Sequence, residues 1–78
     1  MRVKYQSMVD GPGPSERIVA ITTSQGGQEE VIVHDSVVQD GTIEVGQVGR
    51  RDDDVLIELP QESASGNWRL WVPSSSVE

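Results

Sequence analysis

β-branched side chains dominate the apolar content of this chain and constrain its fold more than any other feature. Twelve valines and five isoleucines stand against three leucines and two methionines. Val and Ile have stiff χ1 angles that suit a pleated sheet better than a helix. No window shows sustained apolar spacing at i, i+3 and i+4, so no α-helix of useful length is expected. The sequence therefore predicts an all-β protein, with helix limited to a single turn near residues 74–76.

Six short apolar runs, each bounded by turn-forming residues, are predicted to be strands. Short antiparallel strands in one small domain favour a small, partly closed barrel or a small sandwich. The predicted strands span approximately residues 2–8, 17–23, 29–34, 42–48, 54–59 and 68–73.

The stretch from Val55 to Pro73 holds all three leucines and both tryptophans, the largest apolar side chains of the chain. Its two apolar runs end at prolines and are separated by small polar residues, which is typical of a hairpin. Strict alternation in the second run places Trp68, Leu70 and Val72 toward the core. The same alternation places Arg69 and Trp71 together on the opposite face.

Glycines indicate two turns and one irregularity. Gly26-Gly27 predicts a type I′ turn, because both central residues of that turn need positive φ, and this register pairs Ile21 with Ile32. Asp40-Gly41 predicts a second turn of the same chemistry. A β-bulge at Gly46 would bend the strand over residues 42–48 and return Val48 to the core side.

The end of the sequence resembles the close of an SH3-type barrel. In that family a strand meets a proline, makes one helical turn and finishes on a hydrophobic residue, and Trp71-Val-Pro-Ser-Ser-Ser-Val77 follows this order. The resemblance implies an SH3-like, partly closed antiparallel barrel of five to six short strands, which a bend at Gly46 would suit. The aromatic-rich opening motif of peptide-binding SH3 domains is absent, and the chain has no Phe. The resemblance therefore implies the architecture and no proline-rich ligand.

Length, charge and cysteine content narrow the function classes. A chain of 78 residues makes one domain, 1–78, and the absence of cysteine favours a reducing compartment. Residues 1–7 lack the apolar region of a signal peptide, and no run approaches the roughly 18 apolar residues of a spanning helix, so a cytoplasmic location is expected. A net charge of −7 argues against a nucleic-acid partner and against an anionic membrane surface.

No motif indicates catalysis, a metal or a cofactor. His34, Asp35 and Ser36 are the residue types of a hydrolase triad, but neighbours along a strand point to opposite faces and do not converge on one substrate atom. The three aspartates at 52–54 lack calcium-loop spacing and adjoin two arginines, so a solvated turn is expected. The sequence predicts no catalytic residue, no metal ligand, no cofactor and no enzyme.

The candidate binding residues are Arg69 and Trp71. A tryptophan exposed beside an arginine has the composition of an interaction hot spot. The opposing interpretation is that the loop over residues 11–15, or strand curvature, covers Trp71. We expect a non-enzymatic, acidic β-barrel interaction module or accessory subunit, with its protein partner and oligomeric state open.

Two alternatives come from other function classes. An acidic mimic of nucleic acid would occupy a cationic surface of a partner, and it predicts that the acids at 52–54, Glu58 and Glu62 cluster on one face. A small ligand-binding domain or enzyme based on carboxylates would require a deep pocket lined by acids.

Overall fold

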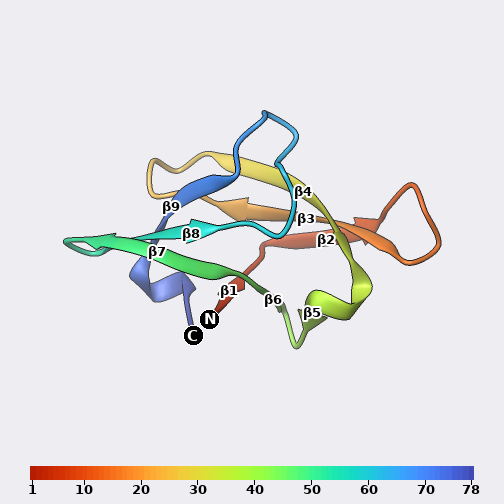
Figure 1. Ribbon diagram of the computed structural model, residues 1–78, viewed down its shortest axis with the longest axis horizontal. Helices are drawn as coiled ribbons and strands as arrows, with labels where there is room; N and C mark the ends of the chain where they lie inside the picture. The colour runs from red at the N-terminus through yellow and green to blue at the C-terminus, as the bar shows by residue number, and fades with distance from the viewer.

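A computed structural model describes all residues 1–78, and it is built from β-strands without any α-helix. The strands form three antiparallel sheets of three strands each (Figure 1). Nine short strands replace the six predicted, chiefly because the first and fourth predicted strands are each divided in two. The strands are β1 (Arg2–Lys4), β2 (Ser7–Asp10), β3 (Glu16–Thr22), β4 (Gln28–His34), β5 (Val38–Gln39), β6 (Thr42–Glu44), β7 (Gly46–Arg51), β8 (Asp54–Glu58) and β9 (Arg69–Pro73).

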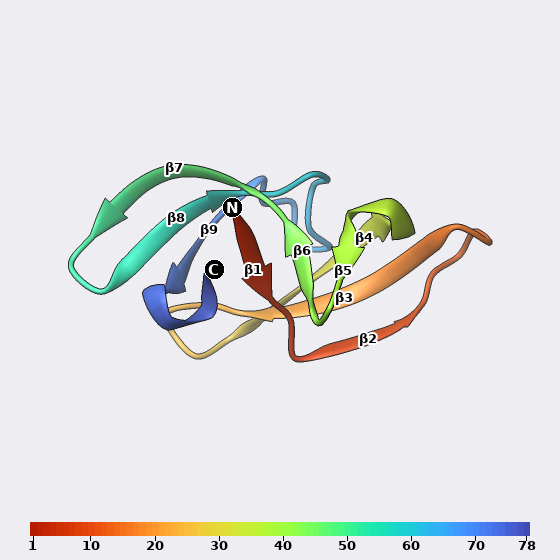
Figure 2. The same ribbon diagram turned by 90° about the horizontal axis from the view of Figure 1, so that it is seen from below.

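Two bent segments connect the three sheets. Sheet A has the order β1-β6-β5, sheet B the order β2-β3-β4, and sheet C the order β7-β8-β9. β1 passes into β2 through Tyr5 and Gln6, so one segment serves sheets A and B. β6 passes into β7 through Val45, so a second segment serves sheets A and C (Figure 2). The small sheet A therefore joins the two larger sheets.

A single apolar cluster lies between the sheets. Alternate residues of each long strand point into it, as the period of two requires. Leu70 and Val72 are buried, which confirms the core side predicted for the last strand. The twelve members are Val3, Val19, Ile21, Val31, Val33, Ile43, Val45, Val55, Ile57, Leu59, Leu70 and Val72.

The predicted barrel is not closed. The hydrogen-bonded ladders stop at Tyr5 and at Val45, which leaves three separate sheets where an SH3-type barrel was expected. The predicted ending is nevertheless present: β9 ends at Pro73 and a 3₁₀ turn follows over Ser74–Ser76. Val77 then pairs with Val3 of β1. The single helical turn near residues 74–76 is confirmed, and a second 3₁₀ turn spans Asp35–Val37.

The predicted register of the first hairpin was wrong by three residues. Ile18, and not Ile21, lies opposite Ile32, and His34 lies opposite Glu16. Only Gly26 has a positive φ of 88°, so the turn is not type I′. Thr23 N–H donates to the Gly27 carbonyl at 2.8 Å, which leaves three residues in the loop. A left-handed glycine at the end of a three-residue loop is a common hairpin closure, and it moves the register away from the two-glycine centre.

The second turn matches its prediction. Asp40 and Gly41 have φ of 52° and 80°, as a type I′ turn requires, and they join β5 to β6. The bulge, by contrast, lies two residues beyond Gly46. Gln47 pairs with Ile57 and Gly49 pairs with Leu56, so Val48 is the extra residue and is 41% exposed. The expectation that Val48 returns to the core was therefore wrong.

No helix in the structure has the length and apolar character needed to cross a membrane.

Candidate functional site

Arg69 and Trp71 lie on the outer face of sheet C, where alternation in β9 placed them. Their neighbours Leu70 and Val72 are buried, so the two side chains leave the strand on the face away from the core. In β8, Glu58 lies opposite Arg69 and Leu56 lies opposite Trp71. Cross-strand partners share a face, so these four side chains form one surface, which we call the sheet C face.

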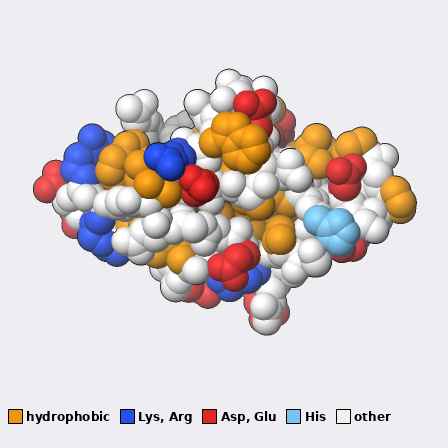
Figure 3. Space-filling model, viewed as in Figure 1, with side chains coloured by type: hydrophobic (Ala, Val, Ile, Leu, Met, Phe, Trp, Pro, Cys, Tyr) orange, Lys and Arg blue, Asp and Glu red, His pale blue; other side chains and the backbone are white.

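Trp71 is half-buried on this face, and an arginine stacks on its ring. The guanidinium carbon of Arg51 lies 4.3 Å from the ring centroid, within the range of a cation–π interaction. Figure 3 shows a hydrophobic patch over β8 and β9 with side chains of the Lys and Arg class on both sides of it. The backbone carbonyl of Trp71 accepts a hydrogen bond from Ser24 N–H at 2.8 Å. The β3–β4 turn, and not the loop over residues 11–15, therefore covers part of β9.

Arg51 is the residue of this face that the sequence analysis missed. It pairs with Asp54 across the turn between β7 and β8, which places it on the same face as Trp71, with β8 between the two strands. It takes part in no ion pair. The signal was available in principle, because a two-residue turn at Asp52 and Asp53 fixes which residue of β7 faces outward. The unrecognised bulge at Val48 hid the pattern further along the strand.

Arg69, unlike Arg51, forms an ion pair. Its Nε donates to Glu58 Oε1 at 3.1 Å, with both side chains about half exposed. An exposed pair of this kind contributes little to stability and can exchange partners. Arg69 can therefore turn toward a binding partner at small energetic cost.

Trp68 does not lie in the core, contrary to the prediction. β9 begins at Arg69, so Trp68 precedes the regular strand and lies in a bend, where it is 52% exposed. Its backbone carbonyl accepts a hydrogen bond from Leu59 N–H at 2.8 Å, which fixes the chain while leaving the indole outside. Alternation applies only within a continuous ladder, and the ladder starts one residue too late to bury Trp68.

A hollow of about 340 Å³ adjoins the sheet C face. Arg51, Arg69 and Trp71 line one side, and the β3–β4 turn and Asn67 line the other. Asp54 also lines it, but its Oδ1 accepts a hydrogen bond from Ser24 Oγ at 2.8 Å. Glu29 lines the hollow as well, and its Oε1 accepts hydrogen bonds from Ser63 and Ser65. The cationic and aromatic side chains of the lining are thus the two arginines and the indole.

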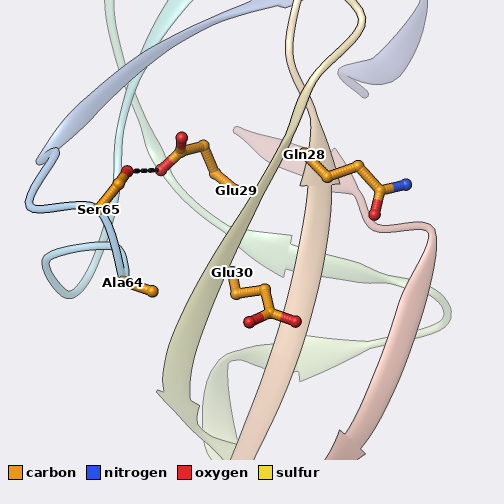
Figure 4. Close-up of a pocket in the computed structure, with 5 residues that line it drawn as sticks. All are labelled: Gln28, Glu29, Glu30, Ala64 and Ser65. Atoms are coloured by element: carbon orange, nitrogen blue, oxygen red, sulfur yellow. Dashed lines mark hydrogen bonds between the residues drawn. The ribbon is translucent and has the colours of Figure 1, made fainter.

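A second polar cluster joins β4 to the loop before β9. Ser63 Oγ donates to Glu29 Oε1 at 2.7 Å, and Ser65 Oγ donates to the same oxygen (Figure 4). Asn67 Nδ2 donates to Ser65 Oγ at 3.1 Å. The hydrogen bonds from Ser65 and Ser63 hold the pKa of the Glu29 carboxyl below its ordinary value of 4.5, against a smaller opposing effect of burial. The cluster keeps Glu29 ionised and anchors the loop.

Glu29 does not form a carboxylate pair with its neighbour Glu30. The two side chains leave β4 in different directions, and only Glu29 points toward Ser65 in Figure 4. Adjacent strand residues cannot share a substrate proton from opposite faces. Their arrangement gives no support to paired-carboxylate chemistry.

His34, Asp35 and Ser36 do contact one another, which strand alternation did not predict. β4 ends at His34 and a 3₁₀ turn follows, so alternation stops there. His34 Nδ1 lies 3.3 Å from Asp35 Oδ1 and 2.8 Å from Ser36 Oγ. A catalytic triad needs Asp and Ser on different ring nitrogens, whereas both lie at Nδ1 here. The Ser36 N–H also donates to Nδ1 at 3.1 Å, so the histidine caps the turn.

The acidic residues are distributed over several surfaces. Asp52 and Asp53 lie in the β7–β8 turn, Glu58 pairs with Arg69, and Glu62 lines a hollow beside sheet B. No group of three His, Cys, Asp or Glu side chains is arranged to hold a metal ion.

Comparisons with protein-family models, with curated protein sequences and with solved structures found no match to this chain. The class that the structure defines is a small all-β domain of three antiparallel sheets.

Proposed function

We propose that the protein is a non-enzymatic interaction module that binds a protein partner through the sheet C face. The observation that carries the proposal is the stack of Arg51 on the half-buried Trp71, which brings β7 and β9 together across β8, the central strand of sheet C. Trp and Arg are the side chains most enriched among interface hot spots. A rigid aromatic residue loses little conformational entropy on binding, so a partner gains contact area at low cost.

The charges of the face favour a partner that presents a carboxylate beside an apolar group. Arg51 has no ion pair, and its guanidinium offers a planar set of donors that suits a carboxylate. Trp71 supplies apolar area beside that guanidinium.

An SH3-like relationship remains part of this proposal. The order of β9, Pro73, a 3₁₀ turn and Val77 supports it. The acidic mimic is less favoured, because Asp52 and Glu62 lie on separate parts of the surface. The carboxylate-based pocket is less favoured because Glu29 is bound to two serines and diverges from Glu30.

The test is quantitative affinity capture from native lysate with the wild-type domain and three variants. Proteins that bind through the sheet C face should be depleted by about tenfold or more with Trp71→Ala and with Arg51→Ala, as expected for hot-spot residues. Arg50→Ala is the matched control, because Arg50 pairs with Val55 on the other face of the same strand. Its capture profile should equal that of the wild type.

Candidate partners from that capture should then be purified and titrated against the same variants. Binding that is equally strong for wild type and Trp71→Ala would refute the sheet C face as the site. Weakening by Arg50→Ala as much as by Arg51→Ala would mean that total positive charge matters and the stacked geometry does not.

A further inference from the structure

An apolar row crosses the outer face of sheet B. The register places Val9 of β2 opposite Ile18 of β3, and Ile18 opposite Ile32 of β4. Val9 is 58% exposed and Ile32 is 42% exposed. Val19 and Val31, their neighbours along the strands, are fully buried on the other face. Single exposed apolar residues are ordinary, but Val9 and Ile32, with the partly buried Ile18 between them, form one continuous row.

The loop before β9 forms a wall beside this row. Ser63 makes an isolated antiparallel bridge with Val31, and Ala64 N–H donates to the Glu30 carbonyl at 2.8 Å. The loop thus pairs along the outer edge of β4 and closes that edge. Between the loop and sheet B lies a hollow of about 310 Å³, lined on its apolar side by Ile18, Ile32 and Ala64.

The polar lining of the hollow is acidic. Glu30 and Glu62 both line it, and no Lys or Arg side chain does. Neither carboxylate takes part in an ion pair, in contrast to Glu58 on the sheet C face. Both residues are exposed, so their charges are solvated and available to a partner.

We propose that this hollow is a docking site for a cationic, apolar segment of another protein. One aliphatic or aromatic side chain of the segment enters the hollow between the loop at Ala64 and the adjacent pair Ile18 and Ile32, and Lys or Arg side chains of the segment lie against Glu30 and Glu62. The net charge of −7 steers a cationic segment toward the domain and adds to the local complementarity. The same charge disfavours a second copy of this chain as the occupant, because two such domains repel each other.

This site goes beyond the function proposed above, since it shares no residue with the sheet C face. Arg51, Arg69 and Trp71 are absent from its lining. A domain with both sites joins an acidic partner to a cationic one. Failure of either site therefore leaves the other standing.

The test is selection of a phage-displayed random 12-residue peptide library on the immobilised wild-type domain. Enriched peptides should carry a net positive charge and at least one large apolar residue. Affinities of the synthesised peptides should fall by about tenfold for Ile32→Ser and for the double variant Glu30→Gln with Glu62→Gln. Binding should weaken as salt rises, and Trp71→Ala should leave it unchanged.

A matched control separates the local carboxylates from the total charge. Asp52→Asn combined with Asp53→Asn removes two charges from the β7–β8 turn, away from the hollow, and should leave peptide affinity within twofold. Circular dichroism of each variant establishes that it is folded. The glutamine double variant keeps the side-chain shapes, so it answers the question even if Ile32→Ser perturbs the sheet.

Three results would overturn the site. The first is an enriched set without positive charge, or no enrichment at all. The second is peptide binding that survives both the Ile32→Ser and the Glu→Gln variants. The third is concentration-dependent dimerisation in sedimentation that Ile32→Ser abolishes, which would make a second copy the occupant.

Discussion

Glu29 shows how one side chain in this domain fixes a long loop. Its carboxylate accepts hydrogen bonds from Ser63 and Ser65, which belong to the loop before β9. Ser63 is only 5% exposed, so its hydroxyl needs a partner inside the protein. The carboxylate supplies that partner and also holds the wall of the hollow beside sheet B.

Replacing Glu29 with Gln should destabilise the domain at pH 7 by about 1 kcal/mol, at the low end for charge-assisted hydrogen bonds because the carboxyl is partly exposed. The folded pKa of Glu29 is lowered from 4.5, so its contribution is present above that value and is lost as pH falls through the folded pKa. The difference in free energy of unfolding between wild type and variant should therefore shrink by pH 3. Urea denaturation at both pH values measures it.

Glu30→Gln is the control for this effect. Glu30 lies next to Glu29 on β4, but its side chain makes no hydrogen bond or ion pair. Its free energy of unfolding should stay close to wild type at both pH values. A larger loss for Glu30→Gln than for Glu29→Gln would contradict the assignment of the serine cluster.

The two tryptophans provide a second test at the scale of single residues. Trp71→Ala should cost about 2 kcal/mol, because the half-buried ring packs on β8 and on Arg51, whereas Trp68→Ala should cost about 1 kcal/mol or less. Urea denaturation gives both values. In the single-tryptophan variants Trp71→Phe and Trp68→Phe, acrylamide should quench Trp68 more strongly than Trp71. The reverse order would restore the core position that sequence alternation gave to Trp68.

At the scale of elements, turns and strand ends determine which parts of the sequence could be interpreted correctly. The strand positions followed from runs of Val and Ile, and the Asp40-Gly41 turn followed from the backbone freedom of its two residues. The first hairpin failed because Gly26-Gly27 permits more than one closure, and hydrogen bonds from Thr23 decide between them. A glycine pair limits the turn types but does not select one.

In the candidate site, too, some residues could be placed from the sequence and one could not. Arg69 and Trp71 were placed on one face by alternation within β9, which the ladder confirms. Arg51 was missed because the predicted strand ended at residue 48, whereas β7 continues to Arg51 through a bulge at Val48. No residue type at Val48 indicates this bulge. Bulge position depends on how the two strands fit over the core, which is a tertiary property.

Gly41 has a positive φ and Gly46 does not, so substitutions at the two positions test where the fold needs the backbone freedom of glycine. Gly41→Ala should destabilise the domain by about 1–2 kcal/mol, because φ is 80° and an L side chain is strained there. Gly46→Ala should change stability by less than about 0.5 kcal/mol, since an added Cβ meets only ordinary contact with Glu58 at 3.7 Å. Thermal or urea denaturation of the two variants tests the pair.

Gly41→Asn provides the rescue for this experiment. Asn tolerates positive φ better than Ala, so it should recover part of the loss. A large loss of stability for Gly46→Ala with none for Gly41→Ala would contradict this assignment and would support a bulge at Gly46, as the sequence predicted.

At the scale of the whole molecule, the bent segments make the three sheets interdependent. β1 and β2 form one segment shared by sheets A and B, and β6 and β7 form another shared by sheets A and C. Val3 lies at their meeting point: it pairs with Ile43 of β6, bridges to Val77 and is fully buried. A domain with one core in this arrangement should unfold as one unit.

Val3→Ala should therefore cost about 2–3 kcal/mol and affect every sheet. Hydrogen exchange of amides in sheets A, B and C should accelerate together, by the factor that corresponds to the loss in global stability. Val9→Ala is the matched control, because Val9 is exposed on β2 and should cost well under 1 kcal/mol. Acceleration confined to sheet A would show that the sheets open independently.

The position of Arg2 beside Glu78 determines how this domain can be joined to other polypeptides. Arg2 N–H donates to the Glu78 carbonyl at 3.4 Å, and Glu78 N–H donates to the Arg2 carbonyl at 2.8 Å. Figure 1 shows the two ends of the chain side by side. A polypeptide that enters and leaves at one point can be placed inside a surface loop of a host protein without a spanning linker. It can also be circularly permuted, with residues 78 and 1 joined by a short flexible peptide and new ends opened at the exposed Gly26.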